Sequence, residues 1–198
     1  MGAALSVALF VVPPLAISCA TGFAMKDEVK GWYKRLNKPS WTPPGWVFGP
    51  VWTVLYTVMG LSAREVWKHT GLRGLPLTLY AVQLALNFAW SPLFFMKHEI
   101  GLALADISAL LGVLTATMVS FHKVSPAAAY ALGPYFLWSS YAAALTASIY
   151  RHNPGERGRL SRRAGAAAED AAQDVSSTAQ AADVKGGNAA TEGGKKAV

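Results

Sequence analysis

The sequence predicts an all-α integral membrane protein, a five-transmembrane-helix bundle with an internal ligand pocket. Five stretches of more than twenty residues contain no Lys, Arg, Asp or Glu apart from Asp106. A helix needs about 20 apolar residues to cross the hydrocarbon core of a bilayer, so each stretch can span it. Basic residues gather in the links between the stretches, and three stretches carry a face of aromatic groups.

We expect the five-span domain to cover residues 1–153, followed by a disordered cytosolic tail. The tail is rich in Ala, Gly, Ser and charged residues and has no aromatic residue, which is typical of disorder. The expected spans are 4–25, 44–67, 75–96, 100–121 and 126–150, and the tail is 154–198.

The first stretch could instead be a secretory signal peptide, because Ser18-Cys19-Ala20 ends in a small residue. A signal peptide carries positive charge before its apolar core, whereas the first basic residue here is Lys26 and Pro13-Pro14 interrupts the run. The pattern therefore favours a membrane span. Cys19 is the only cysteine, so an intramolecular disulfide is excluded and nothing indicates an oxidising compartment.

The net charge of +7 does not indicate nucleic-acid binding, because the basic residues lie between apolar stretches. Eleven of them lie in the first link, the third link and the segment just after the last span, and four lie in the other links. Basic residues are enriched on the cytosolic side of membrane proteins. We therefore expect the first link and the C-terminus to be cytosolic. No organelle address is recognisable, which leaves the mitochondrial outer membrane and the endoplasmic reticulum or secretory membranes open for a eukaryotic protein.

The third stretch has two faces of different chemistry. Amide and aromatic groups recur every three or four residues, at Tyr80, Gln83, Asn87, Trp90 and Phe94. This spacing places them on one side of a helix. The opposite side carries Ala81, Ala85 and Ala89, a row of small residues that often mediates helix association in lipid. Amide groups facing lipid are costly, so the polar face should point into the bundle.

The polar face has two interpretations. Gln83 and Asn87 either bond only to other helices or also line a ligand cavity. Similar faces in two other stretches favour a cavity: Phe48, Trp52, Leu55, Tyr56 and Met59 in the second, and Pro134, Trp138, Ala142, Leu145 and Ile149 in the fifth. Such walls suit a large, flat, apolar ligand with a polar edge. Prolines within the stretches should kink the helices and leave room for it: Pro50, Pro92 and Pro134.

The tryptophans divide by position. Trp67 lies at a span end, where indoles form an interfacial belt. Trp32, Trp41 and Trp46 lie in or beside the first link, where belt, packing and ligand roles are all open. Those well inside spans are the pocket candidates: Trp52, Trp90 and Trp138.

Other chemistry is sparsely represented. Asp106 is the single carboxyl inside a span, which suggests a proton or ion path, but a simple hydrogen bond is the alternative because no second ionisable residue lies at that depth. The four histidines lie at span ends or in links, so neither a metal site nor axial haem ligation inside the bundle is indicated. We predict no metal site and no required cofactor.

Several motifs between Phe10 and Asn153 resemble those of the translocator protein family, also called tryptophan-rich sensory proteins or peripheral benzodiazepine receptors. They are Trp32-Tyr33, Lys38-Pro39-Ser40-Trp41-Thr42-Pro43-Pro44-Gly45-Trp46, Val51-Trp52-Thr53-Val54-Leu55-Tyr56, Gln83-Leu84-Ala85-Leu86-Asn87-Phe88-Ala89-Trp90, Pro92-Leu93-Phe94-Phe95, Pro134-Tyr135 with Trp138, and Tyr150-Arg151-His152-Asn153.

The resemblance implies a five-helix bundle, a homodimer, that binds porphyrins, haem, sterols and benzodiazepine-type ligands in a pocket capped by the first link. Trp32 and Trp41 would belong to the cap. With Tyr56 from the second face, the expected ligand-binding residues are Trp52, Tyr56, Asn87, Trp90, Trp138, Ala142 and Leu145. In bacterial relatives, tryptophans matching Trp52 and Trp138 are tied to light-dependent breakdown of protoporphyrin, which makes these two the candidate catalytic residues.

Two departures from the animal members weaken a sterol as the ligand. Leu102 stands where they have a tryptophan, and Ala147 or Ser148 stands where their cholesterol-recognition pattern has a tyrosine. Tyr150 does not restore the pattern, because Arg151 follows it without a spacer. We therefore expect protoporphyrin or haem as the ligand. A transporter of this ligand is the favoured function, with a porphyrin-degrading enzyme and a ligand-regulated stress-signalling scaffold as alternatives.

Overall fold

The computed structural model describes residues 2–156, 158, 166, 169 and 172–173. Within these residues the chain forms helices and no strand, as the sequence predicts. Nearly all of the predicted tail, 154–198, lies outside the described residues, so its disorder stays a prediction.

Four helical segments are long and apolar enough to cross a membrane. They cover the first four uncharged stretches of the sequence. They are α1 (Ala3–Ala24), α4 (Phe48–Thr70) with the preceding turn η1 (Gly45–Val47), α5 (Leu75–Ser91) with the π-helical η2 (Pro92–Met96), and α6 (Ile100–His122).

The fifth stretch forms two helices, α7 (Pro126–Ala131) and α8 (Gly133–His152). Ser125 caps α7, since its side-chain oxygen accepts a hydrogen bond from the Ala128 N–H at 3.4 Å. Helix α8 has 20 residues, but it is not among the helices apolar enough to span a membrane by composition, and Ser, Thr and Tyr hydroxyls lie along it.

The prediction that three prolines kink their helices is wrong for two of them. Pro50 and Pro134 lie in the first turns of α4 and α8, where a missing N–H breaks no helical hydrogen bond. Pro92 does alter its helix, because the backbone changes from α-helical to π-helical at this residue. Inside α1, Pro13 and Pro14 are accommodated in a continuous helix.

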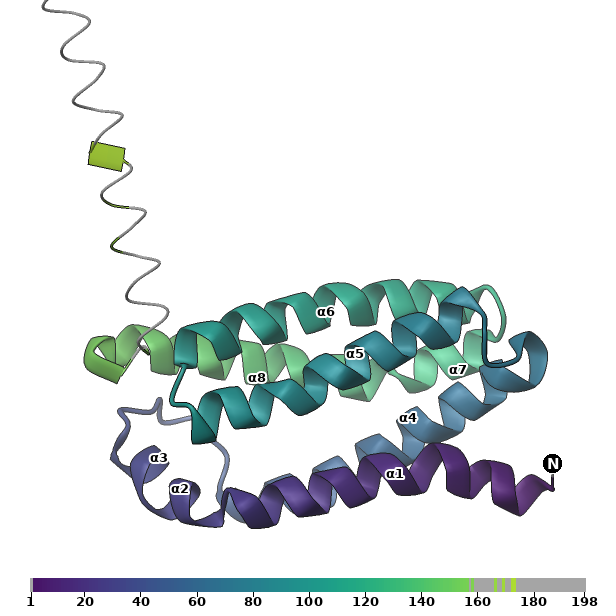
Figure 1. Cartoon of the computed structure of the whole chain (residues 1–198), viewed down its shortest axis with the longest axis horizontal. Coiled ribbons are helices and arrows are strands. Elements are labelled where there is room, and N and C mark those ends of the chain that lie inside the picture. The colour runs from purple at the N-terminus through teal and green to yellow at the C-terminus, as the bar shows by residue number, and fades with distance from the viewer. Residues whose placement is uncertain (1, 157, 159–165, 167–168, 170–171, 174–198) are drawn as a thin grey trace, which may run out of the picture. The chain divides into compact units, whose positions relative to one another are not determined.

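Two pairs of neighbouring helices and α8 form the bundle (Figure 1). Helix α1 runs beside α4, and α5 runs beside α6. Gly60 allows the close approach of α1 to α4, since a Cβ at this position would lie 2.5 Å from the carbonyl oxygen of Phe10. The first link contains two short helices, α2 (Lys26–Lys30) and α3 (Trp32–Arg35), and lies at the same end of the bundle as the end of α8.

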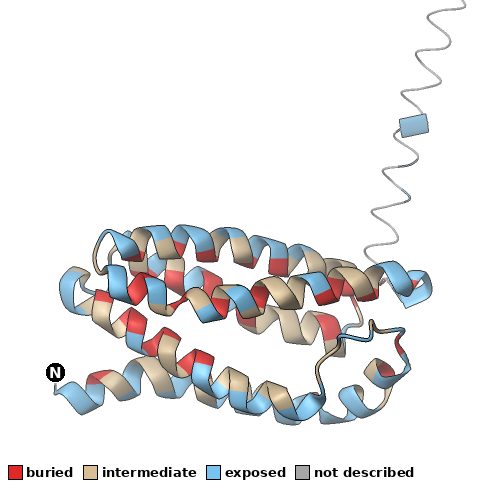
Figure 2. Ribbon diagram, turned by 180° about the vertical axis from the view of Figure 1, so that it is seen from behind, coloured by how far each residue is buried: buried red, intermediate tan, exposed pale blue. Residues whose placement is uncertain are grey.

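The buried residues lie on the inner faces of the helices, as Figure 2 shows. The polar stripe of α5 points inward as predicted: Tyr80, Gln83, Asn87 and Phe94 are buried. Ala81 and Ala85, on the opposite face, are exposed. Helix α1 has only two buried residues, Ser6 and Pro14, so most of its apolar surface faces outward.

Candidate functional site

A cavity of about 290 Å³ lies between the helices at the end of the bundle covered by the first link. Side chains from α1, α4, α5, α6, α8 and the first link form its wall. Small-molecule sites enclose roughly 300–1,000 Å³, so this cavity is near the lower end of that range.

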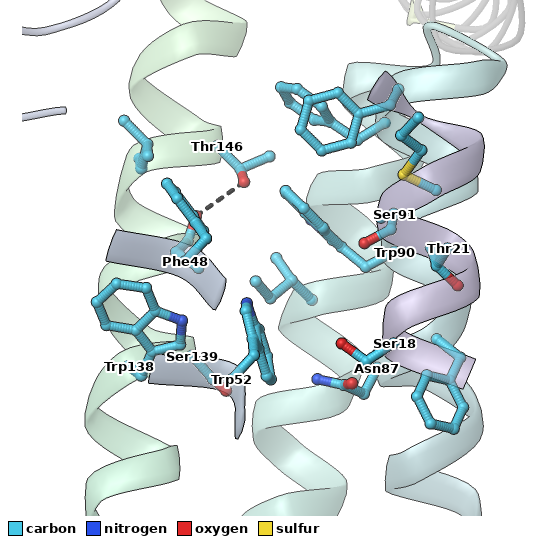
Figure 3. A pocket seen from close by; sticks show the side chains of 18 of the residues that line it. Ser18, Thr21, Phe48, Trp52, Asn87, Trp90, Ser91, Trp138, Ser139 and Thr146 are labelled. Atoms are coloured by element: carbon cyan, nitrogen blue, oxygen red, sulfur yellow. Dashed lines mark hydrogen bonds between the residues drawn. The ribbon is translucent and has the colours of Figure 1, made fainter. Parts of the chain in front are cut away.

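All seven predicted ligand-binding residues line this cavity. Figure 3 shows Trp138 and Trp52 on one side of it and Trp90 with Asn87 on the other. The structure therefore brings together residues from three helices that the sequence grouped by helical periodicity. The seven are Trp52, Tyr56, Asn87, Trp90, Trp138, Ala142 and Leu145. Their contact with a ligand stays a prediction.

Each cavity tryptophan stacks on another aromatic ring. Ring centroids are 5.1 Å apart for Trp52 and Tyr56, 5.0 Å for Trp90 and Phe94, and 5.7 Å for Trp138 and Tyr141, with interplanar angles of 26°, 17° and 29°. Offset stacking of this kind stabilises both rings and fixes their orientation. The cavity therefore has rigid, flat aromatic walls.

A chain of buried hydrogen bonds lies behind the polar part of the wall. The Tyr56 hydroxyl donates to Asn87 Oδ1 at 2.6 Å, and Asn87 Nδ2 donates to the Tyr135 hydroxyl at 3.0 Å. The Tyr135 hydroxyl in turn donates to Gln83 Oε1 at 2.9 Å. This chain joins α4, α5 and α8.

The two interpretations of the polar face therefore apply to different residues. Gln83 is fully buried, does not line the cavity and bonds across to α8. Asn87 bonds across to α4 and α8 and also lines the cavity. Its amide has two N–H groups, of which the bond to Tyr135 uses one. Asn87 can offer the other to a ligand acceptor.

The first link, which contains Trp32 and Trp41, closes the cavity with other residues. Neither Trp32 nor Trp41 lines it, and Met25, Val29, Tyr33, Pro43 and Gly45 do. Trp41 is 47% exposed, and its carbonyl oxygen accepts a hydrogen bond from the Tyr141 hydroxyl at 2.6 Å. The link thus caps the cavity, while the carbonyl of Trp41 and its ring, edge-on to Tyr141 at 5.4 Å, hold the link to α8.

Tyr33 is the polar group of the cap. Burial, with a smaller contribution from the nearby Tyr141 phenol, raises the pKa of the Tyr33 hydroxyl above its usual value. The hydroxyl therefore stays protonated at neutral pH and can donate a hydrogen bond to a ligand.

Several cavity residues were missed in the sequence. Ser18, Thr21 and Gly22 line the cavity from α1. Their three- to four-residue spacing within an apolar stretch was an available signal. Ser139 and Thr146 on α8 lie about one helical turn from predicted residues. Ile107 and Leu110 line the cavity from α6, where no polar stripe marks the inner face.

Asp106 does not line the cavity, and its Oδ2 atom is buried without a hydrogen-bond partner in the described part of the chain. No group of three or more His, Cys, Asp or Glu side chains that could hold a metal ion occurs among the described residues. The polar groups of the cavity wall are therefore the Asn87 amide and several Ser, Thr and Tyr hydroxyls, set among aromatic and aliphatic side chains.

An all-helical chain with four apolar helices of spanning length is a multi-helix integral membrane protein. Residues 10–151 match the model of the TspO/MBR family, and the protein belongs to this family.

Named relatives share this sequence over most of their length. The translocator protein of Homo sapiens is 46% identical over 152 residues, which cover 75% of this chain and 89% of the relative. That of Sus scrofa is 45% identical over 145 residues, or 69% of this chain and 86% of the relative. Protein CrtK of Rhodobacter capsulatus is 36% identical over 156 residues, or 77% of this chain and 98% of the relative.

Proposed function

We propose that this protein binds a tetrapyrrole, protoporphyrin or haem, in the cavity and transports it. The observation that carries the proposal is the set of flat indole walls on Trp52, Trp90 and Trp138 around a single accessible amide, Asn87. A large planar apolar ligand gains most from stacking on such walls, and its polar edge can pair with the amide. A sterol lacks the aromatic plane and is a secondary ligand.

We infer that α8, with α7, is the fifth membrane span. The first link and the end of α8 are in contact, because the Asn37 N–H donates to Asn153 Oδ1 at 2.8 Å. Two segments in contact outside the membrane lie on the same side, so an even number of spans separates them. Helices α4, α5 and α6 supply three, and α8 is the remaining long helix between them.

The five spans orient the protein with its first link and tail in the cytosol, since these segments carry most of the basic residues. The exposed small residues of α5, including Ala81 and Ala85, form the surface of a homodimer. If the protein is eukaryotic, the host membrane we propose is the mitochondrial outer membrane or the endoplasmic reticulum and secretory membranes.

Light-dependent porphyrin breakdown is the second candidate function. Trp52 and Trp138 both line the cavity, and Trp52 also lies 6.2 Å from the ring of Tyr135 in the helix core. Indoles and phenols are oxidisable, so Trp52, Tyr56 and Tyr135 provide a connected set of aromatic rings beside the bound macrocycle. An enzyme consumes the porphyrin, whereas a transporter releases it unchanged.

The test uses purified protein in liposomes titrated with protoporphyrin, haem or cholesterol. Quenching of tryptophan fluorescence measures binding, and porphyrin absorbance in light and darkness measures breakdown. We expect saturable binding of both tetrapyrroles and weaker binding of cholesterol. Replacement of the 77% exposed Trp46 by Phe is the control, since this indole lies off the cavity. Tight binding of cholesterol alone would overturn the proposal. Loss of porphyrin in light that is faster than in protein-free liposomes would establish the enzyme.

A further inference from the structure

Trp32 holds the first link against the segment that follows α8. Only 6% of this residue is exposed, and its Nε1 donates a hydrogen bond to Glu156 Oε2 at 2.8 Å. Its ring stacks on His98 with 4.1 Å between centroids and meets Phe94 edge-on at 5.6 Å. The indole is therefore fixed by an acceptor on one side and by rings on the other.

A second set of bonds joins the same two segments at Asn37. The Asn37 N–H donates to Asn153 Oδ1 at 2.8 Å, and Asn153 Nδ2 donates to the carbonyl oxygens of Asn37 at 2.9 Å and Ile149 at 2.8 Å. Asn153 thus fastens the link to the last turn of α8. We use the term latch for Asn153 and Glu156 together.

The latched part of the link lies beside its cavity-facing residues. Tyr33 follows Trp32 directly and lines the cavity, as do Met25 and Val29 on the N-terminal side. With the link in this position, the cavity volume is about 290 Å³. A ligand as large as a macrocycle therefore requires part of the wall to move when it enters or leaves, and the link is the part of the wall that is held by side-chain hydrogen bonds rather than by the packing of long helices.

We propose that Asn153 and Glu156 are positioning residues that hold the first link closed over the cavity and so set the rate of ligand exchange. Glu156 lies beyond residues 10–151, the part of the chain that matches the family model, whereas Asn153 ends the motif Tyr150-Arg151-His152-Asn153. The proposal rests on the proposed function in that the cavity holds a ligand.

A separate contact keeps the link attached when the latch is broken. Glu28 Oε2 lies 3.0 Å from His98 Nε2, which joins α2 to the segment before α6. Loss of the latch should therefore loosen the link without unfolding it. Because the Glu156 carboxylate is exposed and screened by water, we expect a modest effect, roughly three- to tenfold.

Two measurements on the full-length protein test the latch. Hydrogen exchange of the 32–38 amides in ligand-free protein reports opening of the link, and stopped-flow fluorescence reports release of protoporphyrin. Glu156→Ala and Trp32→Phe should each accelerate both rates, since Phe keeps a ring against His98 but lacks the N–H donor. The double variant should be no faster than either single variant. Glu156→Gln, which keeps an acceptor oxygen, should restore most of the wild-type rate.

The matched control is Glu65→Ala, which removes an exposed carboxylate paired with Lys68 on α4, outside the cavity wall and the latch. Unchanged exchange in Glu156→Ala, or additive effects in the double variant, would overturn the latch. If the wild-type protein binds no protoporphyrin, the proposed function fails. The hydrogen-exchange measurement, which uses ligand-free protein, still tests whether Glu156 holds the link closed.

Discussion

Tyr135 is the residue on which the buried hydrogen-bond chain depends most, because it accepts from Asn87 and donates to Gln83. Tyr135→Phe should lower the free energy of unfolding by about 1–2 kcal/mol, since two buried amide groups lose a partner. Thermal unfolding in detergent measures this. The control is Tyr130→Phe, whose ring is 71% exposed and which should leave stability unchanged. Equal stability of the two variants would mean that water replaces the hydroxyl of Tyr135.

Trp138 tests the stacking wall. A base stacked on an aromatic side chain gains about 1–3 kcal/mol, and the same range for a macrocycle makes Trp138→Ala weaken porphyrin binding roughly ten- to a hundredfold. Trp138→Phe should bind with little loss, because phenylalanine still offers a flat ring. If Trp138 also takes part in breakdown, the Phe variant should bleach porphyrin more slowly in light. Fluorescence titration and absorbance measure the two effects, and unchanged affinity of the Ala variant would argue against stacking on this residue.

At the scale of helices, the crossing of α1 and α4 depends on Gly60. A methyl group there would meet the backbone of Phe10, which no side-chain rotation can relieve. We expect Gly60→Ala to destabilise the protein by about 1–3 kcal/mol. Gly112→Ala on α6 is the control, since nothing lies within 4 Å of its Cβ position, and alanine there should stabilise the helix by up to about 1 kcal/mol. If both variants unfolded at lower temperature than the wild type, or both at higher temperature, the close contact would not be what distinguishes Gly60 from Gly112.

The opposite faces of α5 predict separate effects on association and binding. Ala85 is exposed on the face away from Asn87. Ala85→Trp should disrupt the proposed dimer, because a bulky ring prevents close backbone approach. Light scattering in detergent measures the mass, with Val119→Trp, at a 55% exposed position on α6, as the control. A variant that stays dimeric but loses porphyrin binding would place association on another surface.

At the scale of the whole molecule, the orientation in the membrane can be tested with single cysteines. In a Cys19→Ser background, Lys34→Cys in the first link should react with an impermeant thiol reagent from the cytosolic side. Lys68→Cys, near the other end of the bundle, should react only from the opposite side. Both side chains are exposed, so accessibility does not limit labelling. Labelling of Lys68→Cys from the cytosolic side and of Lys34→Cys only from the opposite side would show that the orientation inferred from the basic residues is wrong.

Much of this architecture could be anticipated from local patterns. Long uncharged stretches predict helices because charge and unpaired backbone groups are costly in lipid. Periodicity separated Asn87 from Ala85 because a helix places residues three or four apart on one face. Local patterns missed Ser18 and Thr21, since α1 is apolar on nearly every side and its inner face is defined by its neighbours.

Contacts between distant segments required the folded chain. The bonds of Trp32 to Glu156 and of Asn37 to Asn153 join residues more than a hundred positions apart. Periodicity does not determine which link lies against which helix end, because that depends on how whole helices pack. For the same reason the sequence left belt, packing and ligand roles open for Trp32 and Trp41 in the cap, whereas packing turns Tyr33 towards the cavity and Trp32 towards the latch. Desolvation and helical spacing act on each residue of a span separately, but the closure of the cavity results from the positions of all the helices together.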